Sequence, residues 1–205
     1  MRIITISREF GSGGRELGKH LAELLGWDYY DREIISAIAE KQGMDEHYVE
    51  KALENRTWQS APLTFHGSFV GSANAVQTNL LVEQKRVIDG IAKLGRSCVI
   101  VGRNSDVLLK EYAPFNLFVC ASLDAKIQRC LDRAVAGAEL SPREVEMQMR
   151  VIDKNRAQTR EIISGIQWGA RENYHLTVNT TGWDLKELAP AVAEFAQRWF
   201  EKEQK

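Results

Sequence analysis

The stretch IITISREFGSGGRELG, residues 3–18, decides the fold of this chain. It opens with an apolar, β-branched run and closes with the start of an amphipathic leucine repeat, and Gly11, Gly13 and Gly14 lie between the two. Glycine lets the backbone curl so that successive N–H groups point inward, and the following helix adds its positive N-terminal end. We therefore predict a strand, a phosphate-binding loop and a helix that together hold the phosphates of a nucleotide.

The loop departs from the common phosphate-loop pattern G-x-x-x-x-G-K-[ST]. If Gly14 is aligned with the last glycine of the pattern, Glu9 replaces the first glycine, Arg15 the lysine and Glu16 the hydroxyl residue. Arginine still supplies a fixed charge and a fork for phosphate oxygens, whereas Glu16 either reaches Mg²⁺ through water or caps the helix. A tight turn without a ligand is the alternative, but such a turn rarely needs three glycines in four positions followed by arginine. The expected phosphate ligands are Gly11, Ser12, Gly13, Gly14, Arg15 and Glu16.

Further apolar runs predict the remaining strands of one parallel sheet. They are residues 27–30, 98–101, 116–120 and 176–178, beside the first run at residues 2–6. Apolar runs without polar alternation are typical of strands that are buried on both faces. Repeats at helical spacing lie between the runs, so the pattern indicates a sheet with helices on both faces. No convincing domain boundary interrupts it, and we predict a single α/β domain over residues 1–205.

Two regions do not follow this alternation. Residues 57–75 are rich in glycine, serine, threonine and asparagine, and we predict a mobile loop there. Residues 141–166 begin with Ser141-Pro-Arg-Glu144, a helix start in which Pro142 takes the first helical position and Glu144 completes a capping box. We predict that this second region is a helix carrying several arginines.

Charge and composition argue against several classes of partner. The chain has 27 lysines and arginines against 28 acidic residues, so we expect neither a nucleic-acid nor a membrane partner. The first apolar run is broken after Ile6, too early for a signal peptide, and no apolar run approaches the roughly 20 residues that cross a bilayer. Three cysteines without metal-ligand spacing, in a chain without a signal, fit a cytoplasmic protein.

Later motifs resemble the cytidylate kinases. VGRN, residues 101–104, is similar to the strand end Gly-Arg-Asp of that family. LFVCASLDAKIQRCLDR, residues 117–133, resembles the next strand and its arginine-bearing helix, and VNTTGWDLKEL, residues 178–188, resembles the last strand and the final helix. ISREFGSGGRE, residues 6–16, is similar to the divergent branch called cytidylate kinase-like proteins. The resemblance covers nearly the whole chain.

The resemblance implies a P-loop nucleoside monophosphate kinase with a five-stranded parallel sheet. It also implies a mobile monophosphate-binding region at about residues 30–75 and a mobile lid at about residues 141–166. In the family the arginine of Gly-Arg-Asp binds the acceptor monophosphate, and Arg103 stands at that position. Asn104 departs from the family's aspartate. A surface arginine that pairs with Asp106 is the alternative for Arg103.

Two further segments gain a role from the resemblance. Asp31 would start the monophosphate-binding helix, but it is equally explained as the N-cap of a helix that begins near Arg32. Arg156 and Arg160 are one helical turn apart and are expected to face the same side. Related lids lower such arginines onto the phosphoryl group in transit, whereas a solvated helix face is the alternative. The Asp-Ser-x-Arg pattern of cytidylate kinases survives only as Ala157-Gln-Thr-Arg.

These expectations define one function and two alternatives. The donor would be ATP with Mg²⁺, and the acceptor CMP, dCMP or a related monophosphate. The expected catalytic residues are Arg15, Arg156 and Arg160, the expected acceptor ligands are Asp31, Arg32, Arg103 and Asn104, and no side chain is expected to bind the metal directly. A regulatory nucleotide-binding protein without catalysis stays open because the usual lysine and hydroxyl residue are missing. A kinase of this fold with another acceptor, and a homo-oligomer, also stay open.

Overall fold

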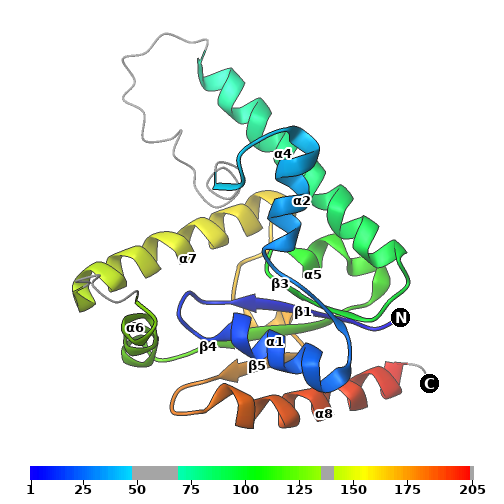
Figure 1. Cartoon of the computed structure of the whole chain (residues 1–205), viewed down its shortest axis with the longest axis vertical. Helices are drawn as coiled ribbons and strands as arrows, with labels where there is room; N and C mark the ends of the chain where they lie inside the picture. The colour runs from blue at the N-terminus through cyan, green and yellow to red at the C-terminus, as the bar shows by residue number, and fades with distance from the viewer. Residues whose placement is uncertain (48–68, 135–140, 204–205) are drawn as a thin grey trace. The chain divides into compact units, whose positions relative to one another are not determined.

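The structure is a computed structural model that describes residues 1–47, 69–134 and 141–203 (Figure 1). The chain divides into two compact units. The sheet unit consists of Met1–Asp31 and Gly95–Lys205, and the helical unit is Arg32–Leu94. The region predicted to bind the monophosphate therefore falls largely in the helical unit, and the predicted lid falls in the sheet unit.

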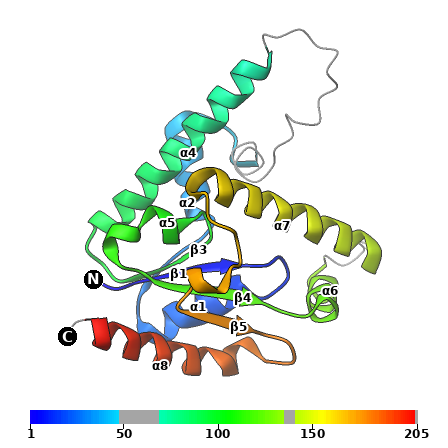
Figure 2. The same ribbon diagram turned by 180° about the vertical axis from the view of Figure 1, so that it is seen from behind.

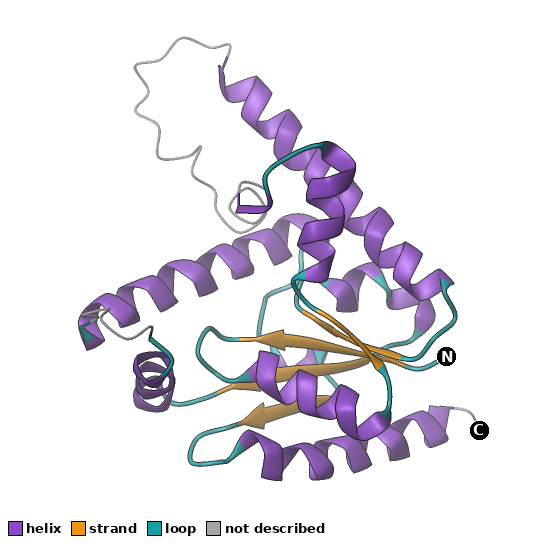
Figure 3. Cartoon of the chain, viewed as in Figure 1, coloured by secondary structure: helices purple, strands orange, loops and turns teal. Residues whose placement is uncertain are grey.

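The sheet unit contains the predicted parallel sheet (Figure 3). Its strands are Ile3–Arg8 (β1), Asp28–Tyr30 (β2), Cys98–Val101 (β3), Phe115–Cys120 (β4) and Leu176–Asn179 (β5). Their bounds closely follow the apolar runs of the sequence, which confirms the predicted α/β fold. The strand order is β2-β3-β1-β4-β5, with Ile4 of β1 in register with Val99 and Phe115. β1 is therefore central, and the glycine loop that follows it lies at the middle of the carboxyl edge of the sheet.

The described helices of this unit flank the sheet. They are Gly14–Leu25 (α1), Ser105–Leu108 (α5), Leu123–Asp132 (α6), Pro142–Ser164 (α7) and Leu185–Glu203 (α8), with 3-10 turns at Lys110–Tyr112 and Arg171–Asn173. α1 and α8 pack together on one side of the sheet, while α5 and the C-terminal part of α7 lie on the other side (Figures 1 and 2). α6 lies beside the N-terminal part of α7.

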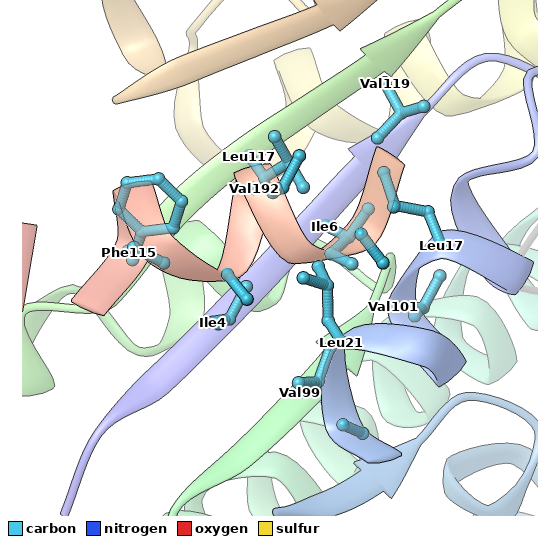
Figure 4. Packing of buried hydrophobic residues seen from close by; sticks show 14 of the residues in the cluster. Ile4, Ile6, Leu17, Leu21, Val99, Val101, Phe115, Leu117, Val119 and Val192 are labelled. Carbon is cyan, nitrogen blue, oxygen red and sulfur yellow. The ribbon is translucent and has the colours of Figure 1, made fainter. Parts of the chain in front are cut away.

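One face of the sheet forms the main core (Figure 4). Alternate residues of β1, Ile4 and Ile6, belong to one buried cluster with Leu17 and Leu21 of α1 and Val192 of α8. Fully burying an aliphatic side chain of this size stabilises a fold by about 1.5–3 kcal/mol. The leucine repeat of α1 therefore fixes the helix on the sheet and holds its N-terminus at the glycine loop.

The opposite face of the sheet is covered as well. Neighbouring residues of a strand face opposite sides, so Phe118 of β4 points away from the main core. Its ring centroid lies 5.4 Å from that of Trp168 and 4.9 Å from that of Tyr174. Burial on both faces explains the continuous apolar run of β4. β5, at the edge, instead exposes Thr177 and Asn179.

The described part of the helical unit contains Glu33–Gln42 (α2) and Phe69–Lys93 (α4). α2 packs against α4, and Lys41 Nζ lies 2.8 Å from the Glu83 carboxylate. The predicted loop over residues 57–75 is wrong for residues 69–75, which belong to α4, and residues 57–68 lie outside the described part. Residues 69–75 can be helical because glycine, serine and asparagine each cost at most about 1 kcal/mol in a helix. Extending the already formed α4 also needs no new nucleus.

Of the helices that the structure describes, none combines the length and the apolar character that a bilayer crossing requires.

Candidate phosphate-binding site

The glycine loop joins the central strand to α1 by left-handed backbone. Gly11 has φ +74° and Gly13 has φ +81°, a region in which a β-carbon is strained. A β-carbon on Gly13 would also collide with Leu185 of α8. Gly13 is the N-cap of α1 and makes no side-chain capping hydrogen bond. The first N–H groups of α1 therefore lack the usual side-chain acceptor, which favours an anionic ligand at this helix end.

Neighbouring elements hold the loop in this shape through its carbonyl groups. The buried Ser12 hydroxyl donates to Glu9 O at 2.8 Å, and the Thr180 hydroxyl donates to Ser12 O at 2.7 Å. Arg129 Nη1, from α6, donates to Gly11 O at 2.7 Å. Because these carbonyl oxygens are already engaged, the loop is fixed before any ligand arrives.

A cavity of about 310 Å³ opens on the loop. Among the described residues that line it, the charged ones are the arginines at positions 8, 15, 129, 133 and 156 and a single carboxylate, Glu9. The remaining lining residues are Phe10, Gly11, Gly13, Gly14, Cys130, Val145 and Gln148. Burial lowers the pKa of Arg129, and the neighbouring charge of Arg133 adds to the shift. Arginine stays protonated nonetheless, so this crowding of positive charge fits a polyanion.

Two carboxylates replace residues of the usual pattern, and each has a cationic partner from α6 or its C-cap. Glu9 Oε2 accepts a hydrogen bond from Lys126 Nζ at 2.9 Å. Glu16 pairs with Arg133. The pair of Glu16 with Arg133 is a contact that the sequence did not suggest, and Glu16 lies in the first turn of α1. Both pairs attach the loop or the start of α1 to α6, and the Lys126 pair offsets the negative charge that Glu9 brings to the cavity.

Arg15 and Asp31 lie together. Arg15, at the lysine position of the pattern, has a 53% exposed side chain and pairs with the buried carboxylate of Asp31. The alternative that Asp31 caps the next helix is wrong, because the N-cap of α2 is Arg32. A residue predicted for the donor and one predicted for the acceptor thus form an ion pair, and Arg15 also lines the cavity.

α7 binds the loop through Asp153 and Arg156. Asp153 Oδ1 accepts from the Phe10 amide at 2.8 Å and from Arg156 Nη1 at 3.0 Å. Arg156 Nη1 also donates to Arg8 O at 3.1 Å, and its guanidinium carbon lies 5.8 Å from the centre of the Phe10 ring. Burial raises the pKa of Asp153, while Arg156 opposes the shift. From the sequence Asp153 is only a weaker candidate than Arg156 and Arg160, yet the structure gives it a direct hydrogen bond to the loop.

Arg160 is not brought to the cavity. Its side chain is 2% exposed, and Nη1 lies 2.5 Å from Oδ2 of the equally buried Asp106 in α5. The expectation that Arg156 and Arg160 face the same ligand is therefore wrong in this structure. Helical spacing puts two Cβ atoms side by side, but these long side chains diverge, one toward the loop and the other into the interior. The capping box at the start of α7, by contrast, is confirmed between Ser141 and Glu144.

The end of β3 carries unusual backbone. Gly102, Arg103 and Asn104 have φ values of +74°, +59° and +52°. Left-handed backbone costs about 1–2 kcal/mol at a residue other than glycine, and such strain is concentrated at functional sites. Arg103 is 8% exposed, so it is not the surface arginine of the alternative interpretation. Asn104 is the N-cap of α5.

Arg32 belongs to the helical unit. There it lines a cavity of about 380 Å³ with Ile35, Asp45, Glu46 and His47. No group of three or more histidine, cysteine or acidic side chains among the described residues is arranged to hold a metal ion. A divalent cation at the glycine loop would therefore depend mainly on the phosphates of its nucleotide and on water.

Solved structures of several kinases share this fold. An uncharacterized protein from Eubacterium ventriosum ATCC 27560 is 21% identical, with a TM-score of 0.71 over 96% of this chain and 99% of that one. Shikimate kinase from Acinetobacter baumannii, in complex with shikimate, is 16% identical, with a TM-score of 0.55 over 97% and 94%. A gluconokinase from Sinorhizobium meliloti 1021 is 14% identical, with a TM-score of 0.53 over 99% and 95%. At these identities the likeness shows the fold alone.

The sequence itself identifies the family. No curated protein matches the chain. The pattern of the cytidylate kinase-like family, however, matches residues 3–182, which include every strand and the glycine loop. The chain therefore belongs to the cytidylate kinase-like family.

Proposed function

We propose that this protein is a phosphotransferase that moves the γ-phosphoryl group of ATP to a nucleoside monophosphate, with CMP or dCMP as the first acceptors to test. The observation that carries the proposal is the cavity on the glycine loop, where five arginines and the N-terminus of α1 surround a space for phosphates. Family membership and the kinase fold support the same reaction class.

The donor would bind through its phosphates. The backbone of residues 11–14 and the N-terminal amides of α1 would hold the β- and γ-phosphates, as in other loops of this kind. Arg15 and Arg156 would neutralise their charge from α1 and from α7. Mg²⁺ would lower the charge of the donor phosphates further.

Transfer needs alignment and charge neutralisation more than covalent chemistry. The bond between the γ-phosphorus and the bridging oxygen of ADP breaks, and a bond to an oxygen of the acceptor monophosphate forms. No general base is required, because a monophosphate is already an anionic nucleophile near neutral pH. The hydrogen bonds of Asp153 and Arg156 to the loop support a lid role for α7, which would exclude water from the reacting atoms.

The acceptor would bind at the carboxyl ends of β2 and β3, where ligands of open α/β sheets bind. We propose Arg103, Asn104 and Asp31 as its ligands in the sheet unit and Arg32 as a further one. The left-handed backbone of Arg103 supports its assignment, because strain of this kind is retained where it serves a function. Arg160 is proposed to position α7 through Asp106 and not to contact phosphate.

One alternative has an observation in its favour. The pairs of Arg15 with Asp31 and of Glu16 with Arg133 engage the two residues that replace the usual lysine and hydroxyl residue. If these pairs persist when ATP binds, the protein would bind nucleotide without efficient transfer and would act as a regulator. A different small-molecule acceptor remains the second alternative, because Asn104 replaces the family's aspartate.

A coupled assay of ADP production separates the three possibilities. The protein is incubated with Mg·ATP and a panel of nucleoside monophosphates, shikimate and gluconate. Turnover that depends on CMP or dCMP supports the proposal, and turnover with another acceptor supports the second alternative. ATP binding without turnover on any acceptor contradicts the kinase assignment and favours the regulator.

A further inference from the structure

Arg8, the last residue of β1, is one of the five arginines that line the cavity, and two glycines lie against its side chain. A β-carbon on Gly14 would lie 2.6 Å from Arg8 Cβ and 3.0 Å from its Cγ. A β-carbon on Gly102 would collide with the guanidinium itself, whose Cζ and two terminal nitrogens are the three atoms nearest to it. The side chain therefore passes the first residue of α1 and ends against the end of β3.

This path connects two parts of the proposed site. Arg8 lines the arginine-rich cavity, and its carbonyl oxygen accepts a hydrogen bond from Arg156. Its guanidinium lies at Gly102, directly before the strained Arg103. The cavity is the proposed donor site, and the end of β3 at Gly102 belongs to the proposed acceptor site. With the donor and acceptor at these two sites, a phosphoryl group that moves from one to the other would pass this guanidinium.

We propose that Arg8 contacts the phosphoryl group in transit and supplies the fixed positive charge that the lysine of the usual loop provides. The inference rests on the proposed function. During transfer the bond from phosphorus to the ADP oxygen breaks while the bond to the acceptor oxygen forms, and negative charge accumulates on the ADP oxygen. A guanidinium held beside the phosphorus stabilises the charge on the equatorial oxygens throughout this step.

Arg15 is less suited to this task. Its side chain is about half exposed and pairs with Asp31, so solvent screens its charge. The Arg8 guanidinium lies in contact with backbone at Gly102, and its stem lies in contact with α1. A charged group that is already in position does not have to be reoriented during the reaction. Preorganised groups therefore stabilise transition states most. We therefore assign the catalytic charge to Arg8 and donor binding to Arg15.

The first test replaces the guanidinium. Arg8→Gln keeps most of the stem, Arg8→Lys keeps the charge without the fork, and Arg198→Gln removes an exposed arginine of α8 as the control. We expect Arg8→Gln to lower kcat about 100-fold or more with a much smaller change in KM for ATP, as for other transition-state donors. Added guanidinium should restore part of the loss. A kcat within a few-fold of wild type, or an equal loss in Arg198→Gln, would overturn the assignment.

The second test displaces Arg8 without changing it. Gly102→Ala and Gly95→Ala carry the same left-handed cost, because their φ values are +74° and +71°, and they flank the same strand. Only the β-carbon at 102 meets the guanidinium, whereas nothing lies within 4 Å at 95. We expect similar losses of thermal stability, a large loss of kcat in Gly102→Ala alone, and little further loss when Gly102→Ala is added to Arg8→Gln. Equal kcat in the two glycine variants would contradict the inference.

A binding measurement separates this inference from the proposed function. If the wild type transfers phosphate to no acceptor, the proposed function fails. The phosphate contact of Arg8 is then tested by the affinity of its variants for inorganic tripolyphosphate. We expect Arg8→Gln to bind this anion about 10-fold more weakly than Arg198→Gln, as loss of a charge-assisted hydrogen bond predicts. Equal affinities of the two variants would overturn the phosphate contact of Arg8.

Discussion

Arg160 of α7 and Asp106 of α5 form an ion pair in the interior of the sheet unit. Their charged atoms are 2.5 Å apart, and both side chains are almost fully buried. Taking two charges out of water is costly, so the contact is stable only while both partners are present. The pair therefore fixes α7 to α5, and Arg156, one turn earlier, donates to the carbonyl of Arg8 at the glycine loop.

Removal of one partner should destabilise the fold. We expect Arg160→Met to lower the free energy of unfolding by about 3–5 kcal/mol, because it leaves the Asp106 carboxylate buried and uncompensated. Urea denaturation measures the change, and adding Asp106→Leu to the variant should recover part of the loss. Unchanged stability together with lost phosphoryl transfer would instead show that Arg160 is a catalytic residue.

The stability of the α7 contact should depend on pH through Asp153. Burial raises the pKa of its carboxyl above the usual value of 3.8, so the folded protein binds this proton more tightly than the unfolded chain. The contribution of Asp153 to stability is thus complete below pH 3.8 and is lost as the pH rises through the folded-state pKa.

We expect Asp153→Asn to gain stability relative to wild type between acid and neutral pH, since asparagine avoids the buried charge. Urea unfolding at a series of pH values, with the exposed Glu201→Gln as control, gives the comparison. A difference in stability that does not vary with pH would contradict the assignment.

Replacement of Glu16 should strengthen anion binding. Glu16→Gln removes the negative charge beside Arg133, which lines the cavity, so we expect tripolyphosphate to bind a few-fold more tightly. The pair is exposed, and its loss should change stability by less than about 1 kcal/mol. Titration calorimetry measures the affinity for tripolyphosphate and for Mg·ATP, with Glu194→Gln as the matched control on α8. Weaker binding of Mg·ATP alone would show that Glu16 acts on the metal through water.

The fold was predictable because its signals are local. A buried parallel strand has a continuous apolar sequence, and the capping box of Ser141 and Glu144 marks the start of α7. Neither signal depends on distant residues. The glycine loop was predictable for the same reason, since strand, glycines and helix follow one another in the chain. The helical start of α4 was missed because residues 69–75 contain weak helix formers that extend an existing helix.

The rest of the site depends on tertiary contacts that no local pattern encodes. The burial of Arg160 requires Asp106, and the path of Arg8 requires Gly102, each far away in the sequence. Spacing within a helix predicts which residues are neighbours, but it does not predict whether a long side chain turns toward a ligand or toward the interior. Glu9 illustrates the same limit, because its partner is Lys126 of α6.

Arg15 should matter for transfer and not for folding. Its side chain is exposed, so we expect Arg15→Ala to fold as wild type does, although loss of the partner of the buried Asp31 carboxylate should lower the free energy of unfolding by about 1–3 kcal/mol. Loss of a donor that binds the phosphates should weaken Mg·ATP binding about 10-fold and lower kcat/KM by at least as much. Steady-state kinetics and calorimetry on the same preparation measure these values. Wild-type turnover in Arg15→Ala would exclude it from the donor site.

The most direct test of the central claim is the identity of the products. The wild-type protein is incubated with Mg·ATP whose γ-phosphate is isotopically labelled, together with CMP, and the nucleotides are separated and weighed by mass spectrometry. We predict equal amounts of ADP and labelled CDP, both formed about 100-fold more slowly in Arg8→Gln. Saturable ATP binding with no labelled product, from CMP or from any other monophosphate in the panel, would contradict the account.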